Sequence, residues 1–374
     1  MKIRRAEAFL IRLPLRITVR HALASRRETL NLVVRLTDDR GREGWGEGVP
    51  RDYVTGEVVE SSFALLTERL LPALAGIEIK GPEQLLPAVA DLLAPEPGTQ
   101  TCCCAAELAL IDLAGKAFDR SAAAWFGGRR RDSVGYGAVL PLLEPPETTH
   151  FLTGVLALGV RHLKIKAEGN RWEEALTESR RVLGDAVTIA VDANGSWDLD
   201  EAAAHLRRME RFDVAWVEQP LPRGREGEVP RLAGRSPIPL MADESLTTVE
   251  EAERLVRQGG FRLFNLRVSK LGGLAATHRV ASIAAASGVR VQVGCQVGES
   301  SLLSAAGRIL AATLPGFEAL EGSYGSRLLQ DDVTDNPYEF GPGGVAEVQR
   351  GPGLGITVAP GRLAQLVIRS VAVS

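Results

Sequence analysis

The chain is poor in cysteine and holds no long uncharged apolar run. Of its four cysteines, three are consecutive at 102–104 and the fourth is Cys295. This spacing offers neither a disulfide framework nor a CxxC metal site, so we expect the triplet on a buried helix. No run of 18 uncharged apolar residues is present, and residues 1–15 alternate charged and apolar positions unlike a signal peptide. We therefore expect a cytoplasmic protein with no membrane partner.

A strong charge of one sign is also missing. Lysine and arginine number 44 against 47 acidic residues, which gives a formal net charge of -3. This balance supplies no electrostatic basis for binding nucleic acid or an anionic surface, so the expected partner is a small molecule. With 374 residues, of which 45% are hydrophobic, the chain is long enough for an α/β barrel and a smaller domain.

The first third of the chain predicts an α+β unit. Two strand-like runs cover residues 2–13 and 29–48. The second run is broken at Asp38 as a hairpin would be, which predicts an antiparallel sheet. From residue 57 to residue 116, apolar residues recur with helical spacing between glycine and proline punctuation.

After residue 126, eight short β-rich runs alternate with amphipathic helical stretches, which predicts a parallel βα array; the first run is 135–140, the seventh 289–296 and the eighth 317–322. Polar residues that end successive predicted strands stand 25 to 27 positions apart: Lys166, Asp192, Glu218, Asp243 and Lys270. The carboxyl ends of barrel strands converge on the face that carries the active site in such enzymes. We therefore expect these side chains to meet there, together with Lys164.

Three of these residues are acids from consecutive predicted strands: Asp192, Glu218 and Asp243. Their mutual repulsion calls for a cation that neutralises them. All three supply hard oxygen ligands, and no histidine or cysteine stands at a comparable position. This donor set favours Mg²⁺ with open positions for a substrate carboxylate.

Two lysines, Lys164 and Lys166, stand two positions apart in "LKIKAE" and project to one face of a strand. Each ammonium group opposes the charge of the other, so we expect Lys166 to act as a base near neutral pH. Lys270 follows on the far side of the acid series. Lys166 and Lys270 would then approach opposite faces of a substrate α-carbon.

The chain resembles the enolase superfamily, and within it the muconate lactonizing enzyme subgroup. The resemblance extends into the first third through "GWGEG" and "AAELALIDLAGK". The motifs that carry it in the remainder are "KIK" at 164–166, "VDANGSW" at 191–197, "WVEQPL" at 216–221, "MADES" at 241–245 and "SKLGG" at 269–273.

This resemblance implies an α/β fold, a (β/α)7β TIM-like barrel at 126–345 with an α+β capping domain at 1–125 that residues 346–374 complete. It implies removal of a proton α to a carboxylate to give an enediolate. It also implies roles for six residues: Mg²⁺ binding by Asp192, Glu218 and Asp243, acid/base work by Lys166 and Lys270, and assistance by Lys164. Enzymes of this kind commonly assemble, so we expect a homo-oligomer.

The choice of reaction within the subgroup depends on other motifs. The predicted seventh strand has no histidine, unlike mandelate racemases and acid-sugar dehydratases, and we expect His278 at the surface. Cycloisomerases, o-succinylbenzoate synthases with N-acylamino acid racemases, and dipeptide epimerases remain. The stretch 44–57 resembles the capping loop of dipeptide epimerases, which favours 1,1-proton transfer on a dipeptide. A catalytically silent binding protein is the non-enzyme alternative, disfavoured by the complete set of lysines and acids.

Substrate contacts are expected from several segments. Glu321 stands where those epimerases carry an Asp-x-Asp pair for the substrate ammonium. The arginine-rich segment 16–28 resembles a mobile specificity loop. The candidates for contact with substrate are Glu321, Glu299, Cys295, Tyr53 and Arg26, with Arg20, His21 and Arg27 as further residues of that loop.

Overall fold

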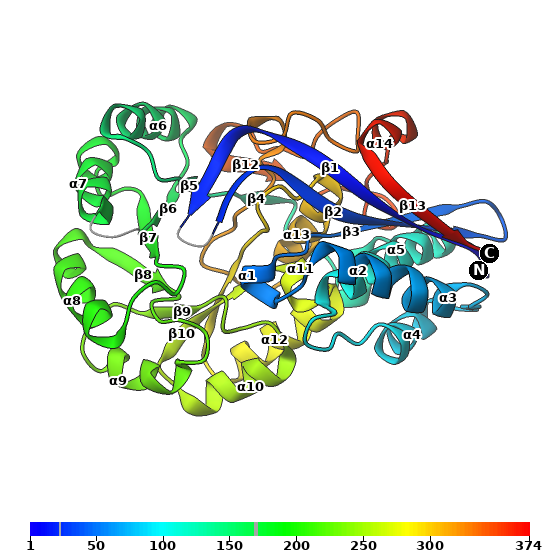
Figure 1. The fold of residues 1–374 in the computed structure, drawn as a ribbon, viewed down its shortest axis with the longest axis horizontal. Helices are drawn as coiled ribbons and strands as arrows, with labels where there is room; N and C mark the ends of the chain where they lie inside the picture. The colour runs from blue at the N-terminus through cyan, green and yellow to red at the C-terminus, as the bar shows by residue number, and fades with distance from the viewer. Residues whose placement is uncertain (22–23, 168–170) are drawn as a thin grey trace.

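Two sheets organise the computed structural model, which describes residues 1–21, 24–167 and 171–374. One is a four-stranded antiparallel sheet in the order β13-β1-β2-β3, and the other is a seven-stranded parallel sheet in the order β11-β10-β9-β8-β7-β6-β5. Figure 1 shows helices α6 to α9 on the left, beside the parallel strands, and helices α2 to α5 of the first third on the right. The structure is thus an α/β protein with a TIM-like part and a capping part.

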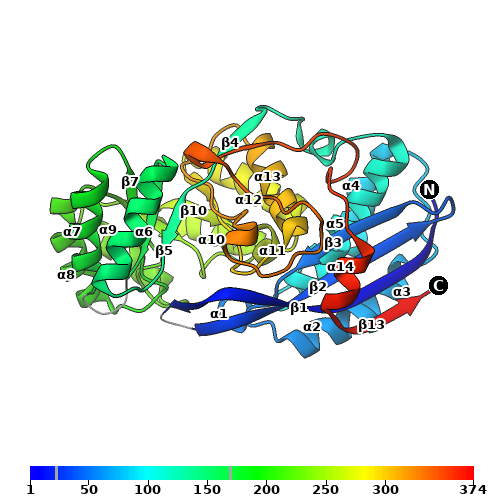
Figure 2. The same ribbon diagram turned by 90° about the horizontal axis from the view of Figure 1, so that it is seen from above.

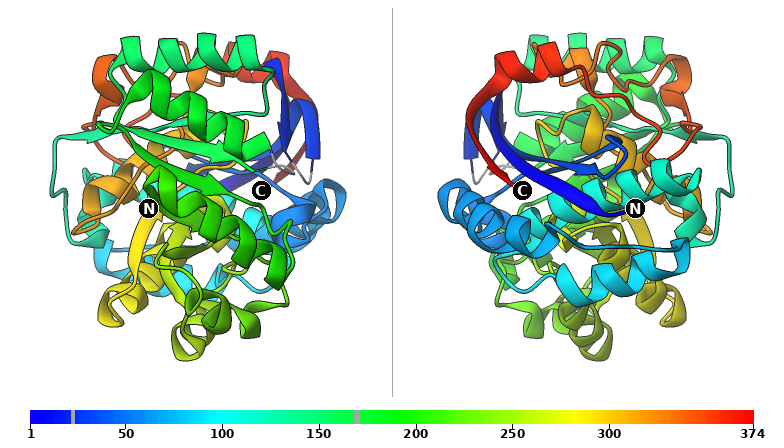
Figure 3. Two further views of the ribbon diagram at one scale, coloured as in Figure 1. Left: turned by 90° about the vertical axis from the view of Figure 1, so that its left-hand side faces the viewer. Right: turned by 90° about the vertical axis from the view of Figure 1, so that its right-hand side faces the viewer.

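The capping part follows the predicted hairpin. Its strands are β1 (Ile3–His21), β2 (Ala24–Asp38), β3 (Glu43–Gly48) and the C-terminal β13 (Val367–Val373). Its helices are α1 (Asp52–Thr55), α2 (Val59–Leu65), α3 (Leu71–Leu74), α4 (Leu85–Leu92) and α5 (Gln100–Phe118). β13 pairs antiparallel with β1, so both chain ends lie at this end of the molecule (Figures 2 and 3).

The segment 16–28, which resembles a mobile specificity loop, is mostly strand in the structure. β1 and β2 pair antiparallel out to Arg20 and Ser25, so most of the segment is the far end of a long hairpin. Its sequence supplies β-branched residues in "RITVR", which favour a strand. Residues 22 and 23 lie outside the described residues, and the side chains of Arg20 and His21 are likewise not described.

Helix α5 is buried almost all round and carries the cysteine triplet, which is buried as predicted. A helix that is apolar on every side belongs inside a protein. Strand β3 lies directly against it, because its glycines leave no side chain between the two elements. A Cβ at Gly46 would sit 2.2 Å from the Ala105 carbonyl oxygen, and one at Gly44 would sit 2.3 Å from that of Ala109.

Replacing Gly46 with alanine is therefore expected to lower the free energy of unfolding by about 3 kcal/mol, at the upper end for overpacking, because the clash is with helix backbone. Urea titration measures it. Gly307→Ala is the matched control: Gly307 lies in helix α13, where a Cβ meets nothing within 4 Å, so alanine should stabilise by up to about 1 kcal/mol. Equal effects of the two changes would contradict the close approach of β3 and α5.

The TIM-like part alternates strands and helices. Its strands are β5 (Ala138–Leu140), β6 (His162–Lys166), β7 (Thr188–Asp192), β8 (Val214–Glu218), β9 (Leu240–Ala242), β10 (Phe261–Leu266) and β11 (Arg290–Val293). Its helices are α6 (Pro145–Leu158), α7 (Arg171–Leu183), α8 (Leu199–Met209), α9 (Val229–Ala233), α10 (Val249–Gln258), α11 (Val268–Leu271), α12 (Leu274–Ala286) and α13 (Ser301–Thr313). Figure 3 shows helices covering the outer side of this sheet.

The predicted eighth strand, in "FEALEG", forms a single bridge rather than a strand. Leu320 bridges Val293 in parallel, and its carbonyl oxygen accepts a hydrogen bond of 2.7 Å from the Gly137 amide. Two short strands, β4 (Ser133–Gly135) and β12 (Val345–Glu347), pair nearby, and helix α14 (Pro360–Leu366) precedes β13. The parallel sheet is therefore curved so far that its two edges approach each other beside Gly137.

The sheet encloses an apolar layer below its carboxyl ends. The layer is a separate buried cluster made of Ala190, Trp216, Met241, Leu263 and Ala319. Ala190 and Trp216 are paired in register, so they share a face of the sheet, and their strands continue on that face to Asp192 and Glu218. The charged residues thus lie next to a layer of packed apolar side chains.

Two buried glutamates of the capping part bind helix N-termini of the TIM-like part. Glu47 of β3 accepts hydrogen bonds from the Ser300 amide (3.0 Å) and from the Leu303 amide (3.0 Å) at the start of α13. Glu107 of α5 accepts one from the Ala275 amide (3.0 Å) in the first turn of α12. Carboxylates at helix N-termini satisfy free amides and complement the helix dipole. The two parts are therefore joined through buried polar contacts near the site.

His278 is not the surface residue that its helix position predicts. It is half-buried on α12, stacked against Phe126 at 4.5 Å between ring centroids and hydrogen-bonded to Thr313 at 3.0 Å. Burial lowers its pKa to about 4. In the part of the chain that the structure describes, no helix is long and apolar enough to cross a membrane.

Candidate active site

The carboxyl ends of three adjacent strands deliver one charged side chain each. Lys166 ends β6, Asp192 ends β7 and Glu218 ends β8, and the three are paired in register across the sheet. Residues in register share a face. Asp243 follows the last residue of β9. The predicted convergence of lysine and acids is present in the structure.

Lys270 reaches the same cluster by a different route from the predicted one. Strand β10 ends at Leu266, and Lys270 lies on the helical turn α11, which Gly272 terminates in a left-handed conformation with φ of 90°. Its Nζ donates to Asp243 Oδ1 (2.9 Å) and to the carbonyl oxygens of Asp243 and Asn265 (2.8 Å each). Complete burial lowers the pKa of Lys270, against the pull of Asp243.

The two lysines of β6 differ in their hydrogen-bond partners. Lys166 Nζ lies 2.6 Å from Asp192 Oδ2 and 3.0 Å from Asn194 Oδ1. Lys164 Nζ lies 2.7 Å from Glu321 Oε2 and 3.1 Å from Glu218 Oε2. Lys164 Nζ also lies 3.7 Å from Asp192 Oδ2, so the repulsion expected between the two ammonium groups is offset in part by an acid that they share.

Lys164 is held in its charged form. Burial alone would lower its pKa, but the carboxylates of Glu218, Glu321 and Asp192 outweigh burial and raise the pKa well above the ordinary value. With a side chain only 3% exposed, Lys164 is a fixed positive charge inside the acid cluster. This suits the assisting role predicted for it.

The basic groups around the three acids do not neutralise the acids equally. All three are fully buried. Burial together with the neighbouring Asp192 charge raises the pKa of Glu218 to about 8. Burial also opposes ionisation of Asp243, but Arg267 and Lys270 hold its pKa well below the ordinary range. Ionising Glu218 fully therefore calls for further positive charge at this place.

The donor set fits Mg²⁺, although the side chains are not arranged as a closed cage. Among the described residues, no three His, Cys, Asp or Glu side chains are positioned to hold a metal ion, and each acid contacts a basic group instead. Beside the acids, Glu244 Oε2 and Asn265 Oδ1 are buried without a hydrogen-bond partner among the described groups. Buried carboxylates with spare oxygen acceptors are the ligands that a hard cation prefers.

Several polar residues of the site were not singled out from the sequence. Arg267 contacts Asp243 and lies 3.6 Å from Glu218, and Asn265 Nδ2 donates to Glu218 Oε1 at 2.7 Å. Asn194 donates to Glu244 Oε1 at 3.0 Å. Alternation along "NLR" was the available signal for Asn265 and Arg267, since a polar residue on the inner face of a buried strand requires a partner.

A cavity of about 440 Å³ opens above the acid cluster. Three predicted substrate contacts line it, namely Tyr53, Cys295 and Glu321. Glu299 lies behind this wall, where it accepts from the Gln296 amide at 3.1 Å, and burial raises its pKa to about 8. Arg26 lies 3.6 Å from Asp52 with its guanidinium 5.4 Å from the centre of the Tyr53 ring, so it adjoins a lining residue.

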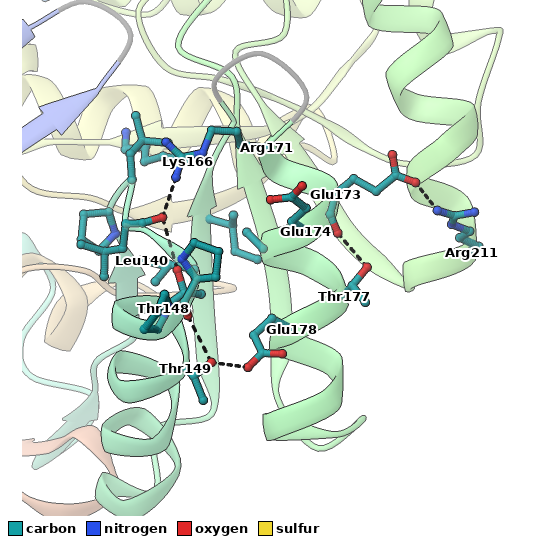
Figure 4. A pocket seen from close by; sticks show the side chains of 17 residues that line it. Leu140, Thr148, Thr149, Lys166, Arg171, Glu173, Glu174, Thr177, Glu178 and Arg211 are labelled. Atoms are coloured by element: carbon teal, nitrogen blue, oxygen red, sulfur yellow. Dashed lines mark hydrogen bonds and ion pairs between the residues drawn. The ribbon is translucent and has the colours of Figure 1, made fainter.

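A second cavity, of about 570 Å³, lies between α6 and α7 (Figure 4). Thr149 donates a hydrogen bond to Glu178 across it, and Arg211 pairs with Glu173 at its side. Lys166 lines both cavities, and none of the three acids is among the described lining residues of either one. The first cavity is the one lined by Lys164 and Arg267 as well as Lys166, and all three of these residues contact the acids.

Comparison with known proteins gives consistent matches over almost the whole chain. The family described as "Enolase C-terminal domain-like" matches residues 149–362. N-succinyl-L-Arg/Lys racemase of Bacillus cereus is 27% identical over 371 residues, 98% of each chain. A crystal structure of the N-succinyl Arg/Lys racemase from that species superposes with a TM-score of 0.92, at 27% identity and covering 100% of both chains.

Relatives with other reactions are equally similar. L-Ala-D/L-Glu epimerase of Bacillus subtilis is 28% identical over 365 residues, 95% of this chain and 97% of the relative. Muconate cycloisomerase 1 of Pseudomonas putida is 30% identical over 354 residues, 91% of each chain. Overall similarity thus leaves the choice among these reactions to the residues of the site.

Proposed function

The chain belongs to the enolase C-terminal domain-like family, and from this premise we propose that it moves a proton between the two faces of the α-carbon of an N-acylated amino acid, dipeptides included. It is an isomerase of the enolase superfamily. One observation carries the proposal: Lys166 on β6 and Lys270 after β10 flank the acids of β7, β8 and β9 in the sheet order.

In this proposal the two lysines divide the proton transfer. A substrate carboxylate lies over the acid cluster, with its α-carbon between the two amines. One lysine removes the α-proton from its own face, and the other returns a proton to the opposite face, which inverts the centre. Lys164 and Arg267 keep positive charge beside the carboxylate throughout.

Asp192, Glu218 and Asp243 would hold Mg²⁺. When bound, the ion supplies the charge that stabilises the enediolate in enzymes of this superfamily. We also take Leu320 as the mark of the eighth strand of a (β/α)7β barrel. The division into residues 1–125 with 346–374 and residues 126–345 stays a prediction.

Deuterium incorporation tests the function. The protein is incubated with Mg²⁺ in D₂O together with dipeptides, N-acylamino acids and cis,cis-muconate, and the products are followed by NMR and chiral separation. Exchange of the α-proton with inversion is the expected result, and a chelator should abolish it. Lactone formation from muconate without any exchange in amino-acid derivatives would show a cycloisomerase instead. No reaction in any class would favour the catalytically silent alternative.

A further inference from the structure

The cavity above the acid cluster continues into an apolar arm along helix α6. Phe151, Gly154, Val155 and Leu158 all line it, and their spacing places them on one face of the helix. The opposite side of the arm is formed by Leu328 and other apolar side chains, among them Phe340 and the hairpin residues Ile17 and Val19. An apolar groove of this kind is typical of a ligand-binding wall.

The arm leaves the barrel interior around the end of β5. Val139 is paired in register with Lys164, so Val139 faces the interior, whereas its neighbour Ala138 faces the opposite side. Both residues line the same cavity. Because the edges of the sheet meet at the Gly137–Leu320 hydrogen bond, the cavity passes around the end of β5 to reach α6.

The polar side chains at the arm give little attraction for an anionic group. His150 and Arg327 both line the cavity. Arg327 already donates to the Phe340 carbonyl oxygen (2.8 Å), lies 3.6 Å from Glu339, and has its guanidinium 4.5 Å from the centre of the Phe340 ring. A second negative charge on the substrate would have to compete with these contacts.

The inner end of the cavity suits a neutral amide. Glu321 is bound to Lys164, so its charge is compensated rather than free for a substrate ammonium. Its other oxygen, Oε1, is buried and has no hydrogen-bond partner among the described groups. An amide N–H would satisfy that acceptor without adding a charge.

We propose that the substrate is an N-acylated amino acid that carries a neutral apolar group of about four or more carbons seated in the α6 arm. This rests on the proposed function. The apolar group comes either from the acyl chain or from the amino-acid side chain. A succinyl group or a free aminoacyl group fits the arm less well, since each places a charge there.

A substrate series tests the proposal. Mg²⁺-loaded protein is given N-acetyl-, N-butanoyl-, N-hexanoyl- and N-succinyl-alanine together with N-acetyl-phenylalanine, and α-proton exchange is measured for each. We expect kcat/KM to rise about fourfold per methylene that enters the arm. A rise in the alkanoyl series assigns the arm to the acyl group, and a rise for phenylalanine alone assigns it to the side chain.

Filling the arm gives an independent test. Gly154→Leu adds a side chain on the lining face, where a Cβ meets nothing within 4 Å. It should lower kcat/KM for N-hexanoyl-alanine at least tenfold and leave N-acetyl-alanine within about twofold. Ala157→Leu is the matched control, because Ala157 is exposed on α6 and does not line the cavity. It should change neither value, and circular dichroism should show both variants folded.

The outcomes separate this proposal from the function it rests on. Exchange that rises neither along the alkanoyl series nor for N-acetyl-phenylalanine, or that is fastest for the succinyl compound, would overturn the apolar arm and leave the proton transfer standing. Equal losses for long and short substrates in Gly154→Leu would also overturn it. Absence of exchange in every compound would remove the proposed function itself.

Discussion

Replacing Glu218 with glutamine is expected to lower kcat/KM by at least about 10⁴-fold. One general base contributes about 10²- to 10⁴-fold, whereas enzymes as a class lower barriers by about 8 to 23 kcal/mol, so electrostatic stabilisation has to supply much of the remainder. Glu218 is the middle acid of the three and contacts Lys164, Asn265 and Arg267. Its loss should remove both a ligand and the balance of charge that positions the others.

Calorimetric titration with Mg²⁺ should show weakened binding in this variant alongside the loss of activity. Glu318→Gln is the matched control, because Glu318 is exposed and pairs with Arg290 at 3.0 Å outside the site. It should keep full activity and Mg²⁺ affinity, since exposed ion pairs contribute little. Full activity in Glu218→Gln, with its fold verified by circular dichroism, would contradict the assignment of the acid cluster.

The acid cluster was predictable because polar residues recur at the same point of successive βα units. Each βα unit returns the chain to the same edge of the sheet, so a regular interval between polar strand ends identifies Asp192, Glu218 and Asp243 before any coordinates are known. The buried cysteine run was predictable for a related reason. Free cysteine behaves as a small apolar residue and is among the residue types most often buried.

Other features depend on contacts that the sequence does not display. The helical turn at Lys270 depends on Gly272 and on carbonyl acceptors from Asp243 and Asn265, which come together only in the fold. The segment 16–28 reads as a charged loop, yet it is extended, because Val19 pairs with Arg26 across the hairpin and the Arg16 amide donates to the Leu328 carbonyl oxygen. Arginine-rich composition reports on side-chain solvation, and it does not decide between loop and edge strand.

The pairing of Lys164 with Glu321 shows the same limit more sharply. In sequence Lys164 and Glu321 are 157 positions apart. The sequence therefore displays only the charge repulsion between the neighbouring lysines Lys164 and Lys166. In the structure the two lysines lie among several acids, one of them Asp192, which contacts both, so their repulsion is offset by residues from other strands. Charge balance in a buried site is set by all the strands together, so a local motif such as the two lysines does not show the acids that neutralise them.

Removing one lysine at a time is expected to separate the two halves of the reaction. Lys166→Met and Lys270→Met each keep the apolar stem and lose the amine, so each should lower racemisation by about 10²- to 10⁴-fold. Each variant should nevertheless still exchange the α-proton of one enantiomer with D₂O, because the remaining lysine faces the proton of that enantiomer. The two variants should differ in which enantiomer they label.

This stereochemical result distinguishes catalysis from a loss of structure. A merely damaged site would lose exchange of both enantiomers in parallel, and a single-base site would leave one of the two variants fully active. Lys80→Met serves as the control, since Lys80 is an exposed residue of the capping part and should leave both exchange rates unchanged. Opposite enantiomer preferences in the two variants require two amines on opposite faces of one carbon. Loss of exchange of the same enantiomer in both variants would place both amines on one face and exclude 1,1-proton transfer with inversion.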